Sequence, residues 1–339
     1  MSLPAPAPAR PHRALAPDDL ARARHIVGRI SGAFRSRVVG QDQLQVSLLV
    51  ALMGDGHILL ESVPGLAKTT AAQTLADAVG GTFSRIQCTP DLLPSDIVGT
   101  QVYEPATGTF STQLGPVHAN VVLLDEINRS SAKTQSAMLE AMQERQTSIG
   151  GVVHPVPDPF IVLATQNPIE HEGTYDLPEA QLDRFLLKEV LGYPQATEEV
   201  EILGRVERRV FATALHADHQ VSVDDVRFLQ RTVDGVYIDP AIKRYIVAIV
   251  QASRPPSGAL GDLSRYVTAG ASPRASISFA QVARALAVLD GRTYAIPEDV
   301  QRLRYQVLRH RILLNFEAVA DGVRPERFVD AVFNAVPTP

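Results

Sequence analysis

The sequence contains a single cysteine, Cys88, among its 339 residues. An internal disulfide is therefore excluded, which is typical of a protein from a reducing compartment. Cys88 ends the strand-like run FSRIQC. In such a run a buried small side chain is a more common role than a nucleophile. We expect a cytoplasmic protein whose cysteine packs in the interior.

Long hydrophobic runs are missing too. The longest, VSLLVALM at residues 46–53, is far shorter than a membrane span requires. The first residues, MSLPAPAPARPHRALAP, hold five prolines and no apolar block, so we do not expect a signal peptide. Their composition predicts a solvated, polyproline-like tail over residues 1–24. Together these features predict a soluble protein with no membrane span.

An excess of positive charge is also absent, because the formal net charge is −5. This balance argues against a protein that coats nucleic acid. Arginines do gather at residues 205–209 and 302–311. At helical spacing such runs are usually solvated helix faces, and we interpret them that way rather than as a DNA-binding patch.

Short apolar runs alternate with helical patterns in the first two thirds of the chain. The strand candidates are residues 57–61, 83–88, 120–126, 160–167 and 185–193. Their nearly continuous apolar character is typical of parallel strands buried on both faces. From about residue 220 onward the patterns are helical, with Asp, Ser or Pro at the helix starts. The pattern predicts an α/β domain with a parallel sheet flanked by helices, followed by a smaller all-α domain.

The segment ESVPGLAKTT, residues 61–70, matches a phosphate-binding loop imperfectly. When the lysine of the pattern G-x-x-x-x-G-K-[ST] is aligned on Lys68, Ser62 and Ala67 occupy the two glycine positions. The context supports the match, because the loop lies between a predicted strand and an amphipathic helix. Lys68 would then reach the β- and γ-phosphates of a nucleotide, and the Thr69 hydroxyl would coordinate Mg²⁺.

A second motif supports the first. The apolar run NVVLLDEIN ends in Asp125 and Glu126. Carboxylates at the C-terminal edge of a parallel strand face the crevice beside the phosphate loop. Asp125 would hold Mg²⁺ through water, and Glu126 would polarise the attacking water. Either motif alone could be a turn, but the ordered pair above predicted strands favours a nucleotide site.

Three further polar residues are candidates for the same chemistry. Asn167 ends the next strand and could align water, although QNP is also an ordinary turn signal. Arg184 precedes the last strand and could equally form a surface ion pair with Asp183. In GASPRA, Ser272 and Pro273 are typical of a helix start and place Arg274 in the first turn. The helix dipole disfavours a cation there, so we expect an anion such as phosphate nearby.

These blocks, together with VVGQ, TPDLLPSDIVGT and QSAMLEAMQERQ, closely resemble MoxR-type AAA+ ATPases over about residues 26–335. The family loop reads G-V-P-G-L-A-K-T, so Ala67 follows the family and Ser62 departs from it. The resemblance implies an AAA+ core with a helical lid that together bind ATP and Mg²⁺. We therefore expect a tail at 1–24, a core at 25–195, a linker at 196–220 and a lid at 221–336.

The resemblance also assigns roles to individual residues. It implies that Glu126, Asn167, Arg184 and Arg274 are catalytic, as Walker B glutamate, sensor 1, arginine finger and sensor 2. Thr69 and Asp125 would hold Mg²⁺. The nucleotide-binding residues would be Val39, Gly40, Ser62, Val63, Pro64, Gly65, Leu66, Ala67, Lys68, Thr69 and Thr70. Arg274 is expected to serve the nucleotide of its own subunit and Arg184 that of a neighbour. The insert at residues 89–112 and a hairpin about Gly150 and Gly151 are expected to face the pore of a ring.

Two functions remain open on this evidence. The first is an ATP-driven, chaperone-like remodeller that matures partner proteins or inserts their cofactors, often with a von Willebrand A-type partner. It would act as a homo-oligomer, with a hexameric ring expected. The second is an ATP-driven nucleic-acid motor, which the acidic charge balance disfavours. A nucleotide-gated scaffold with little turnover is disfavoured by the presence of Glu126, Asn167 and Arg184 together.

Overall fold

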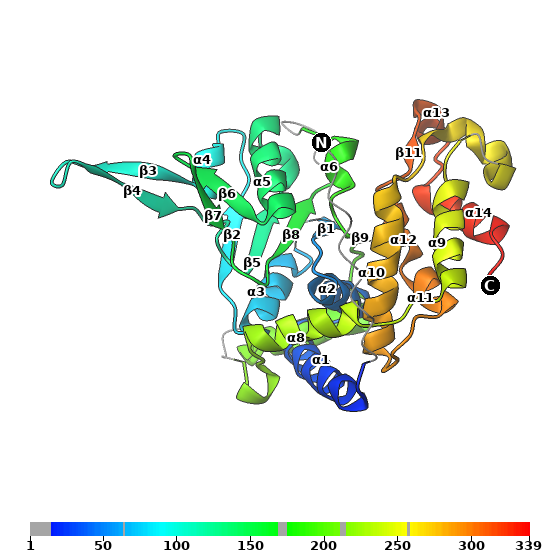
Figure 1. The fold of residues 1–339 in the computed structure, drawn as a ribbon, viewed down its shortest axis with the longest axis horizontal. Coiled ribbons are helices and arrows are strands. Elements are labelled where there is room, and N and C mark those ends of the chain that lie inside the picture. Colours follow the sequence, from blue (N-terminus) through cyan, green and yellow to red (C-terminus); the bar gives the residue numbers. More distant parts are fainter. Residues whose placement is uncertain (1–14, 64, 169–174, 211–214, 256–257) are drawn as a thin grey trace, which may run out of the picture.

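The computed structural model describes residues 15–63, 65–168, 175–210, 215–255 and 258–339. Pro64, one of the predicted loop residues, lies outside them. Figure 1 presents an α/β part whose sheet is followed, further along the chain, by a group of helices. Within the described residues, none of the helices has the length and apolar character that crossing a membrane requires.

Five parallel strands form the central sheet, as the sequence predicted. In spatial order they are β2 (Phe83–Gln87), β5 (Val121–Asp125), β8 (Ile161–Gln166), β1 (Ile58–Glu61) and β9 (Leu187–Val190). Because all five run in the same direction, the loops that follow β1, β5 and β8 meet at one edge of the sheet. The segment that precedes β9 lies at the opposite edge.

Helices cover both faces of the sheet, which explains the continuous apolar runs. Val121 and Leu123 of β5 belong to a cluster with α1 (Pro17–Arg37), α2 (Asp42–Met53) and α3 (Lys68–Ala78). Their neighbours Val122 and Leu124 join a second cluster with α5 (Ala132–Glu144). Successive strand residues point to opposite faces, so a strand covered on both sides must be apolar throughout. Cys88 lies in this second cluster and is buried, as predicted.

Helical structure is present before the predicted tail boundary at residue 24. Helix α1 starts at Pro17, and Ala23 is fully buried. The signals for this start are local: Pro17 occupies the first turn, Asp18 and Asp19 are acidic there, and the last turn is basic. The Pro-rich composition upstream obscured them.

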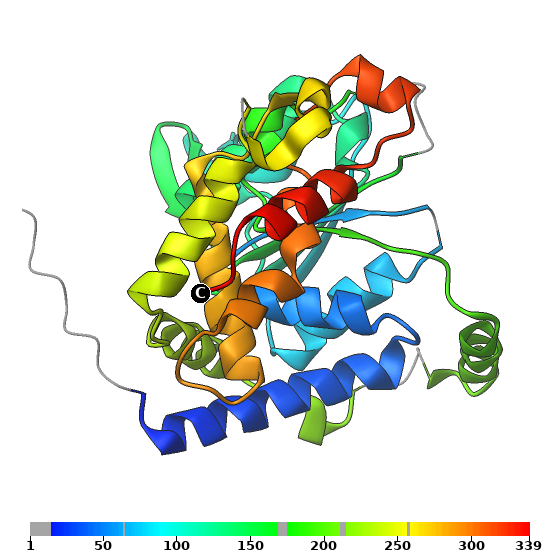
Figure 2. The same ribbon diagram turned by 90° about the vertical axis from the view of Figure 1, so that its right-hand side faces the viewer.

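The C-terminal part is mainly helical, as predicted (Figure 2). Its longer helices are α8 (Val223–Asp234), α9 (Pro240–Ala252), α10 (Pro273–Leu289) and α14 (Pro325–Ala335), and its shorter ones are η4 (Gly258–Tyr266), α11 (Pro297–Arg302), α12 (Arg304–Leu308) and α13 (Phe316–Ala320). The helical pattern of the stretch IPEDVQRLRYQVLRHRI, residues 296–312, is divided in the structure, because Leu303 separates α11 from α12. A small antiparallel pair, β10 (Val267–Ala269) with β11 (Leu313–Leu314), was also not predicted. Along the chain, β9 is followed by α7 (Ala196–Glu207) and η3 (Ala217–His219), and then by α8.

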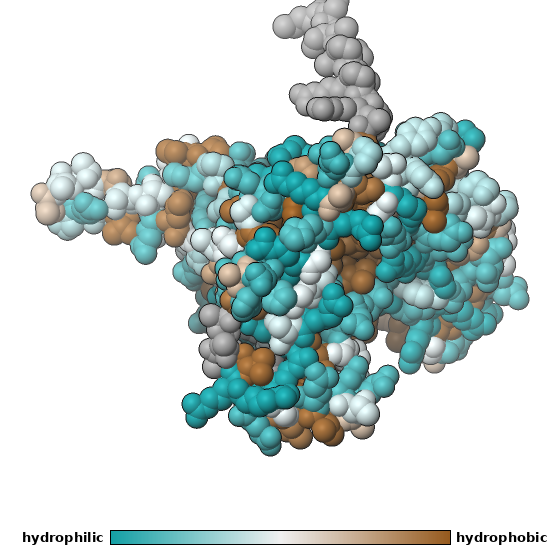
Figure 3. Space-filling view, turned by 90° about the horizontal axis from the view of Figure 1, so that it is seen from below, coloured by the Kyte–Doolittle hydropathy of each residue, from teal (hydrophilic) through white to brown (hydrophobic). Residues whose placement is uncertain are grey.

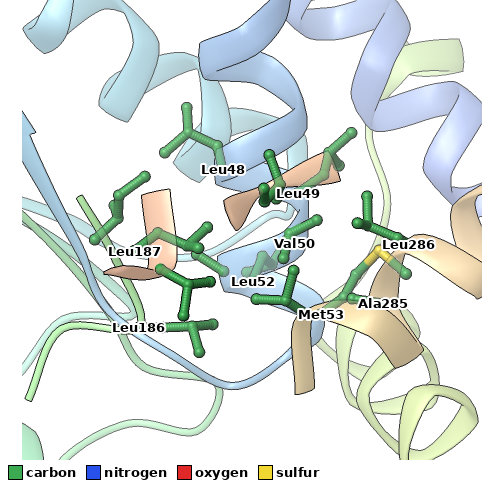
Figure 4. Packing of buried hydrophobic residues seen from close by; sticks show 14 of the residues in the cluster. Leu48, Leu49, Val50, Leu52, Met53, Leu186, Leu187, Ala285 and Leu286 are labelled. Atoms are coloured by element: carbon green, nitrogen blue, oxygen red, sulfur yellow. The ribbon is translucent and has the colours of Figure 1, made fainter. Parts of the chain in front are cut away.

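One hydrophobic cluster joins the sheet to the helical part. Helix α2 is buried along Leu48 to Met53 and lies between the two (Figure 4). The same cluster contains Leu187 of β9 and Leu286 of α10. Interior packing is therefore continuous across the predicted boundary between core and lid.

Two hairpins extend from the α/β part. The longer pairs β3 (Gly99–Glu104) with β4 (Thr109–Leu114), follows α4 (Pro94–Val98), and projects far from the body (Figures 1 and 3). The shorter pairs β6 (Gln146–Ile149) with β7 (Val152–Pro155). Its turn residues Gly150 and Gly151 both have positive φ, 58° and 81°, which the two-residue turn of a hairpin favours. This hairpin and the insert were both predicted from the sequence.

Candidate functional site

A cavity of about 410 Å³ opens at the C-terminal edge of the sheet. It is lined by residues from three segments, namely Gly65, Leu66, Ala67, Lys68, Thr69, Thr70, Arg85, Gln87, Asp125 and Glu126. The predicted phosphate loop and the predicted acidic pair thus border one space. We call it the Lys68 cavity.

The backbone of the loop accounts for its sequence. Gly65 has a φ of 86°, which glycine adopts without steric cost. Ala67, directly before α3, has a φ of 53° and is left-handed although it carries a Cβ. Ser62 is not among the residues with positive φ, and its hydroxyl donates to the Val63 carbonyl at 3.1 Å. Position 62 therefore does not require glycine, whereas position 67 stores strain of the kind found at functional sites.

Asp125 is held by two neighbours. Its Oδ1 accepts a hydrogen bond from the Thr165 hydroxyl at 2.9 Å, and its Oδ2 forms an ion pair with Arg85 at 2.6 Å. The residue is only 8% exposed. Arg85 neutralises this buried carboxylate, so a metal ion that binds Asp125 would compete with the guanidinium.

Glu126 lies beside Asp125, at the entrance of η1 (Ile127–Arg129), with a left-handed φ of 58°. Its backbone N–H donates to the same Thr165 hydroxyl at 2.8 Å. Its Oε2 accepts from Gln87 and from Arg129, both at 3.2 Å. Thr165 thus fixes both acidic residues, and Glu126 is oriented toward the cavity by a strained backbone.

Asn167 follows β8 directly and is buried at 6% exposure. It therefore lies at the same sheet edge as Asp125 and Glu126, since β5 and β8 are neighbouring parallel strands. The predicted grouping of the loop, the acidic pair and this amide at one edge is present in the structure.

Arg184 and Arg274 lie elsewhere. Arg184 precedes β9, so it stands at the N-terminal edge of the sheet, where it lines a separate cavity of about 240 Å³ with Gln143 and Gln181. Arg274 donates to Gln143 Oε1 at 3.4 Å. Neither arginine lines the Lys68 cavity. Ser272 at the start of α10 is bonded to Asp183 at the opposite edge, so this arrangement does not place Arg274 beside the Lys68 cavity of its own chain, where we expected it.

Val39 and Gly40, in the turn between α1 and α2, are not part of the Lys68 cavity lining either. Gly40 has a φ of 66°, and a Cβ there would meet the Glu198 carboxylate of α7 at 2.3 Å. The structure explains this glycine by its backbone and by α7. Nucleotide contact at these two positions stays a prediction.

Comparison with known proteins bears on what this arrangement is. Residues 57–187 match the family described as "ATPase family associated with various cellular activities (AAA)", and residues 262–332 match the AAA lid domain. The chain is 48% identical over 323 residues to Chaperone MoxR1 of Mycobacterium tuberculosis, covering 95% of this chain and 85% of that protein. It is 32% identical to Protein MoxR of Paracoccus denitrificans, covering 91% and 94%. The chain belongs to the MoxR family of AAA ATPases.

A solved structure supports this membership. The crystal structure of a Cytophaga hutchinsonii protein aligns with a TM-score of 0.89 at 42% identity, covering 95% of this chain and 97% of that one. The expected fold, an AAA core with a five-stranded parallel sheet and a helical lid, is confirmed. Membership of the AAA ATPases implies ATP binding and hydrolysis.

Sequence reasoning missed four polar residues of this MoxR-family site: Arg85, Gln87, Arg129 and Thr165. Arg85 and Gln87 are two residues apart in β2, so their side chains lie on the same face of the sheet, where they contact Asp125 and Glu126. Thr165 of β8 is a hydroxyl residue that directly follows the apolar run FIVLA, residues 160–164. A polar residue within a strand that is buried on both faces was the available signal for it.

Proposed function

We propose that this chain binds ATP with Mg²⁺ in the Lys68 cavity and uses ATP hydrolysis to remodel partner proteins. The observation that carries the site is that Lys68, Thr69, Asp125 and Glu126 line one cavity. A hydroxyl and a buried carboxylate facing the same space are the oxygen donors that Mg²⁺ prefers, so the residues fit the ion. When bound, Mg²⁺ would neutralise charge on the phosphates.

The residues of the chain divide the remaining work. Lys68 would neutralise the β- and γ-phosphates, and the loop amides would bind their oxygens. Glu126, held by Gln87 and Arg129, would accept a proton from water, and Asn167 would help to place that water. Arg85 would have to release Asp125 when the metal ion arrives.

Two substitutions test this assignment. Lys68→Ala removes the cation of the loop and should abolish ATP binding, measured by calorimetry. Glu126→Gln keeps the shape but removes the charge that activates water, so it should bind ATP and hydrolyse it at least about 10²-fold more slowly. Unchanged ATP affinity in the first variant, or wild-type turnover in the second, would refute the site.

We further propose that Arg184 and Arg274 act on the nucleotide of a neighbouring subunit. Both lie at the sheet edge opposite to Lys68, and neither reaches the Lys68 cavity of its own chain. A contact in which one edge meets the opposite edge of the next copy is head to tail. Repeated, it closes into a ring, and we propose a hexamer.

Mixing experiments test the ring. Arg184→Ala should bind ATP normally and lose about 10³-fold or more in turnover, as expected for an arginine that stabilises the transferring phosphoryl group. Lys68→Ala should be inactive because it binds no ATP. In a mixture, subunits with an intact loop meet neighbours with an intact Arg184, so part of the activity should return. A mixture that stays inactive despite proven subunit exchange contradicts the proposal.

The hairpins support a protein client. Neither β3–β4 nor β6–β7, residues 99–114 and 146–155, contains Lys or Arg, the side chains that neutralise nucleic-acid phosphates. They instead expose apolar side chains, namely Val102, Tyr103, Phe110, Leu114, Val152 and Val153. Maturation or cofactor insertion in a cytoplasmic partner complex, with a von Willebrand A-type partner, is the proposed role. Strong, salt-sensitive stimulation of the ATPase by DNA would favour the alternative of a nucleic-acid motor.

A further inference from the structure

Asp183 connects the segment that carries Arg184 to the helical lid. Its Oδ1 accepts a hydrogen bond from Nε of Arg311 at 2.8 Å, and its Oδ2 accepts one from the Ser272 hydroxyl at 2.7 Å. Arg311 follows α12 and Ser272 precedes α10, so both partners belong to the lid. One carboxylate next to the predicted arginine finger therefore bonds to two separate lid segments.

Arg311 binds the backbone on both sides of Arg184. Its guanidinium donates to the carbonyls of Asp183 at 3.3 Å, Phe185 at 2.6 Å and Leu186 at 3.4 Å. It also donates to Ser278 of α10 at 3.0 Å. The run 302–311 was predicted to be a solvated face, yet the Arg311 side chain is only 1% exposed. A cation buried this deeply is tolerated because Asp183 and the carbonyls satisfy it.

Ser272 extends the same network to Arg274. Its hydroxyl donates to Asp183 and, as the N-cap of α10, accepts from the Arg274 backbone N–H at 3.0 Å. The Arg274 side chain contacts Gln143, and Gln143 borders the cavity that Arg184 lines. Arg184, which is half-buried, and Arg274, which is exposed, therefore share one supporting network and one face of the molecule.

We propose that Asp183 and Arg311 are positioning residues that hold Arg184 and Arg274 as one unit, so that both reach the phosphates of the neighbouring subunit together. This inference rests on the proposed function. It adds a mechanical consequence: a rotation of the lid in one subunit carries Arg184 with it and changes catalysis in the next. A network that served only stability would have no such effect.

The first test is Asp183→Asn, which is nearly isosteric but removes the negative charge opposite Arg311. We expect turnover to fall about 10- to 100-fold, because a displacement of about 1 Å has effects of this size. ATP affinity at the intact Lys68 cavity should stay within about twofold. The matched control is Asp158→Asn, which weakens another ion pair between core and lid, Asp158–Arg227, and should leave turnover unchanged.

A mixing experiment separates positioning from damage to the fold. Asp183→Asn subunits keep their loop, and Lys68→Ala subunits keep a well-placed Arg184, so the mixture should exceed the activity of either variant alone. If Asp183→Asn is as active as the wild type, or gains nothing in the mixture, the inference is overturned. Arg184→Ala mixed with Lys68→Ala runs in parallel. If the mixture of Arg184→Ala with Lys68→Ala regains no activity, both the action of Arg184 in trans and this inference are refuted. If that mixture regains activity but the mixture of Asp183→Asn with Lys68→Ala does not, only this inference is refuted.

A second variant covers the case in which Asp183→Asn does not fold. Ser272→Ala removes the bond to Asp183 together with an N-cap, and Ser222→Ala removes the N-cap of α8 without any contact to this network. Both should lose similar stability. Only Ser272→Ala should lose turnover and recover it with Lys68→Ala. Equal turnover in the two serine variants would contradict the proposal.

Discussion

At the scale of single residues, the phosphate loop shows which parts of a motif the backbone requires. The pattern has glycine at positions 62 and 67, but only position 67 is left-handed in this chain. By comparison with the family loop, Ser62 was the departure and Ala67 was the expected residue. In the structure the strained position is Ala67, where the small alanine side chain tolerates a φ of 53° at a cost of about 1–2 kcal/mol.

Substitutions at Ala67 should therefore depend on backbone conformation. Ala67→Gly should keep ATP affinity within about twofold, because glycine adopts the same left-handed conformation without steric cost. Ala67→Val should weaken affinity markedly, because a β-branched residue avoids the left-handed region. Ser62→Gly should bring no gain. Calorimetric titration with ATP measures all three, and a tight-binding Ala67→Val variant would show that the conformation is not needed.

His57 gives the protein a specific sensitivity to acid. Its Nδ1 accepts from the Val162 N–H and its Nε2 donates to the Met142 carbonyl, both at 3.1 Å, so only the neutral ring satisfies both bonds. Burial, with Arg145 nearby, lowers the pKa of His57 to about 3. The unfolded chain, with a pKa near 6.5, then binds more protons than the folded one between these values.

Stability should therefore fall as the pH drops from about 6.5 toward 3, by about 1.4 kcal/mol per pH unit for this group. Urea unfolding at pH 7 and pH 5 measures the change. His57→Gln should be less stable at pH 7 but should lose less stability on acidification. His25→Gln, at an exposed position, should behave like the wild type. An equal loss in the wild type and His57→Gln would contradict this origin of the acid sensitivity.

At the scale of elements, the sequence predicted what local patterns determine. The five strands of the sheet agree within about three residues at each end with the predicted ones, because strands buried on both faces have a distinctive apolar signal. The turn at Gly150 and Gly151 and the N-cap at Ser272 were predicted for similarly local reasons. The grouping of Lys68, Asp125, Glu126 and Asn167 followed from the two motifs together with the predicted parallel strands.

What could not be predicted depends on how distant segments pack. The position of Arg274 is set by the bond between Ser272 and Asp183, 89 residues apart. The burial of Arg311 depends on carbonyls more than 120 residues away, so its local run looked solvated. Arg85 and Thr165 joined the site through contacts between neighbouring strands, which a motif search along one strand does not detect.

The β3–β4 hairpin carries the element-scale prediction about clients. Tyr103 and Phe110 are 53% and 65% exposed, and their ring centroids are 5.2 Å apart. Replacing both with serine should weaken binding of an unfolded probe, reduced carboxymethylated α-lactalbumin, and leave ATP affinity unchanged. Fluorescence anisotropy measures the binding. Tyr193→Ser is the control, since Tyr193 is 75% exposed away from the hairpins. Equal binding by all variants would remove the hairpin from client recognition.

At the scale of the whole molecule, one hydrophobic cluster extends from the sheet through α2 to α10 (Figure 4). Leu286 of α10 is fully buried in it. Domains with separate cores can unfold one at a time, whereas a shared core couples them. We therefore expect core and lid to unfold together. This coupling would also let lid position and sheet-edge residues influence one another, as the network about Asp183 requires.

Cys88 offers a probe for this coupling, because it lies in the second cluster, on the sheet face away from α2 and α10. Burial raises the pKa of its thiol to about 12, so an alkylating reagent should reach a reactive thiolate only when the core opens. Leu286→Ala, in the lid, should lower the free energy of unfolding by about 2–5 kcal/mol. Alkylation of Cys88 should then accelerate roughly 30-fold or more. Val319→Ala, at a lid position that is 72% exposed, should not change the rate. If Leu286→Ala melts the lid in calorimetry while Cys88 reacts as slowly as in the wild type, core and lid are independent units despite their shared packing.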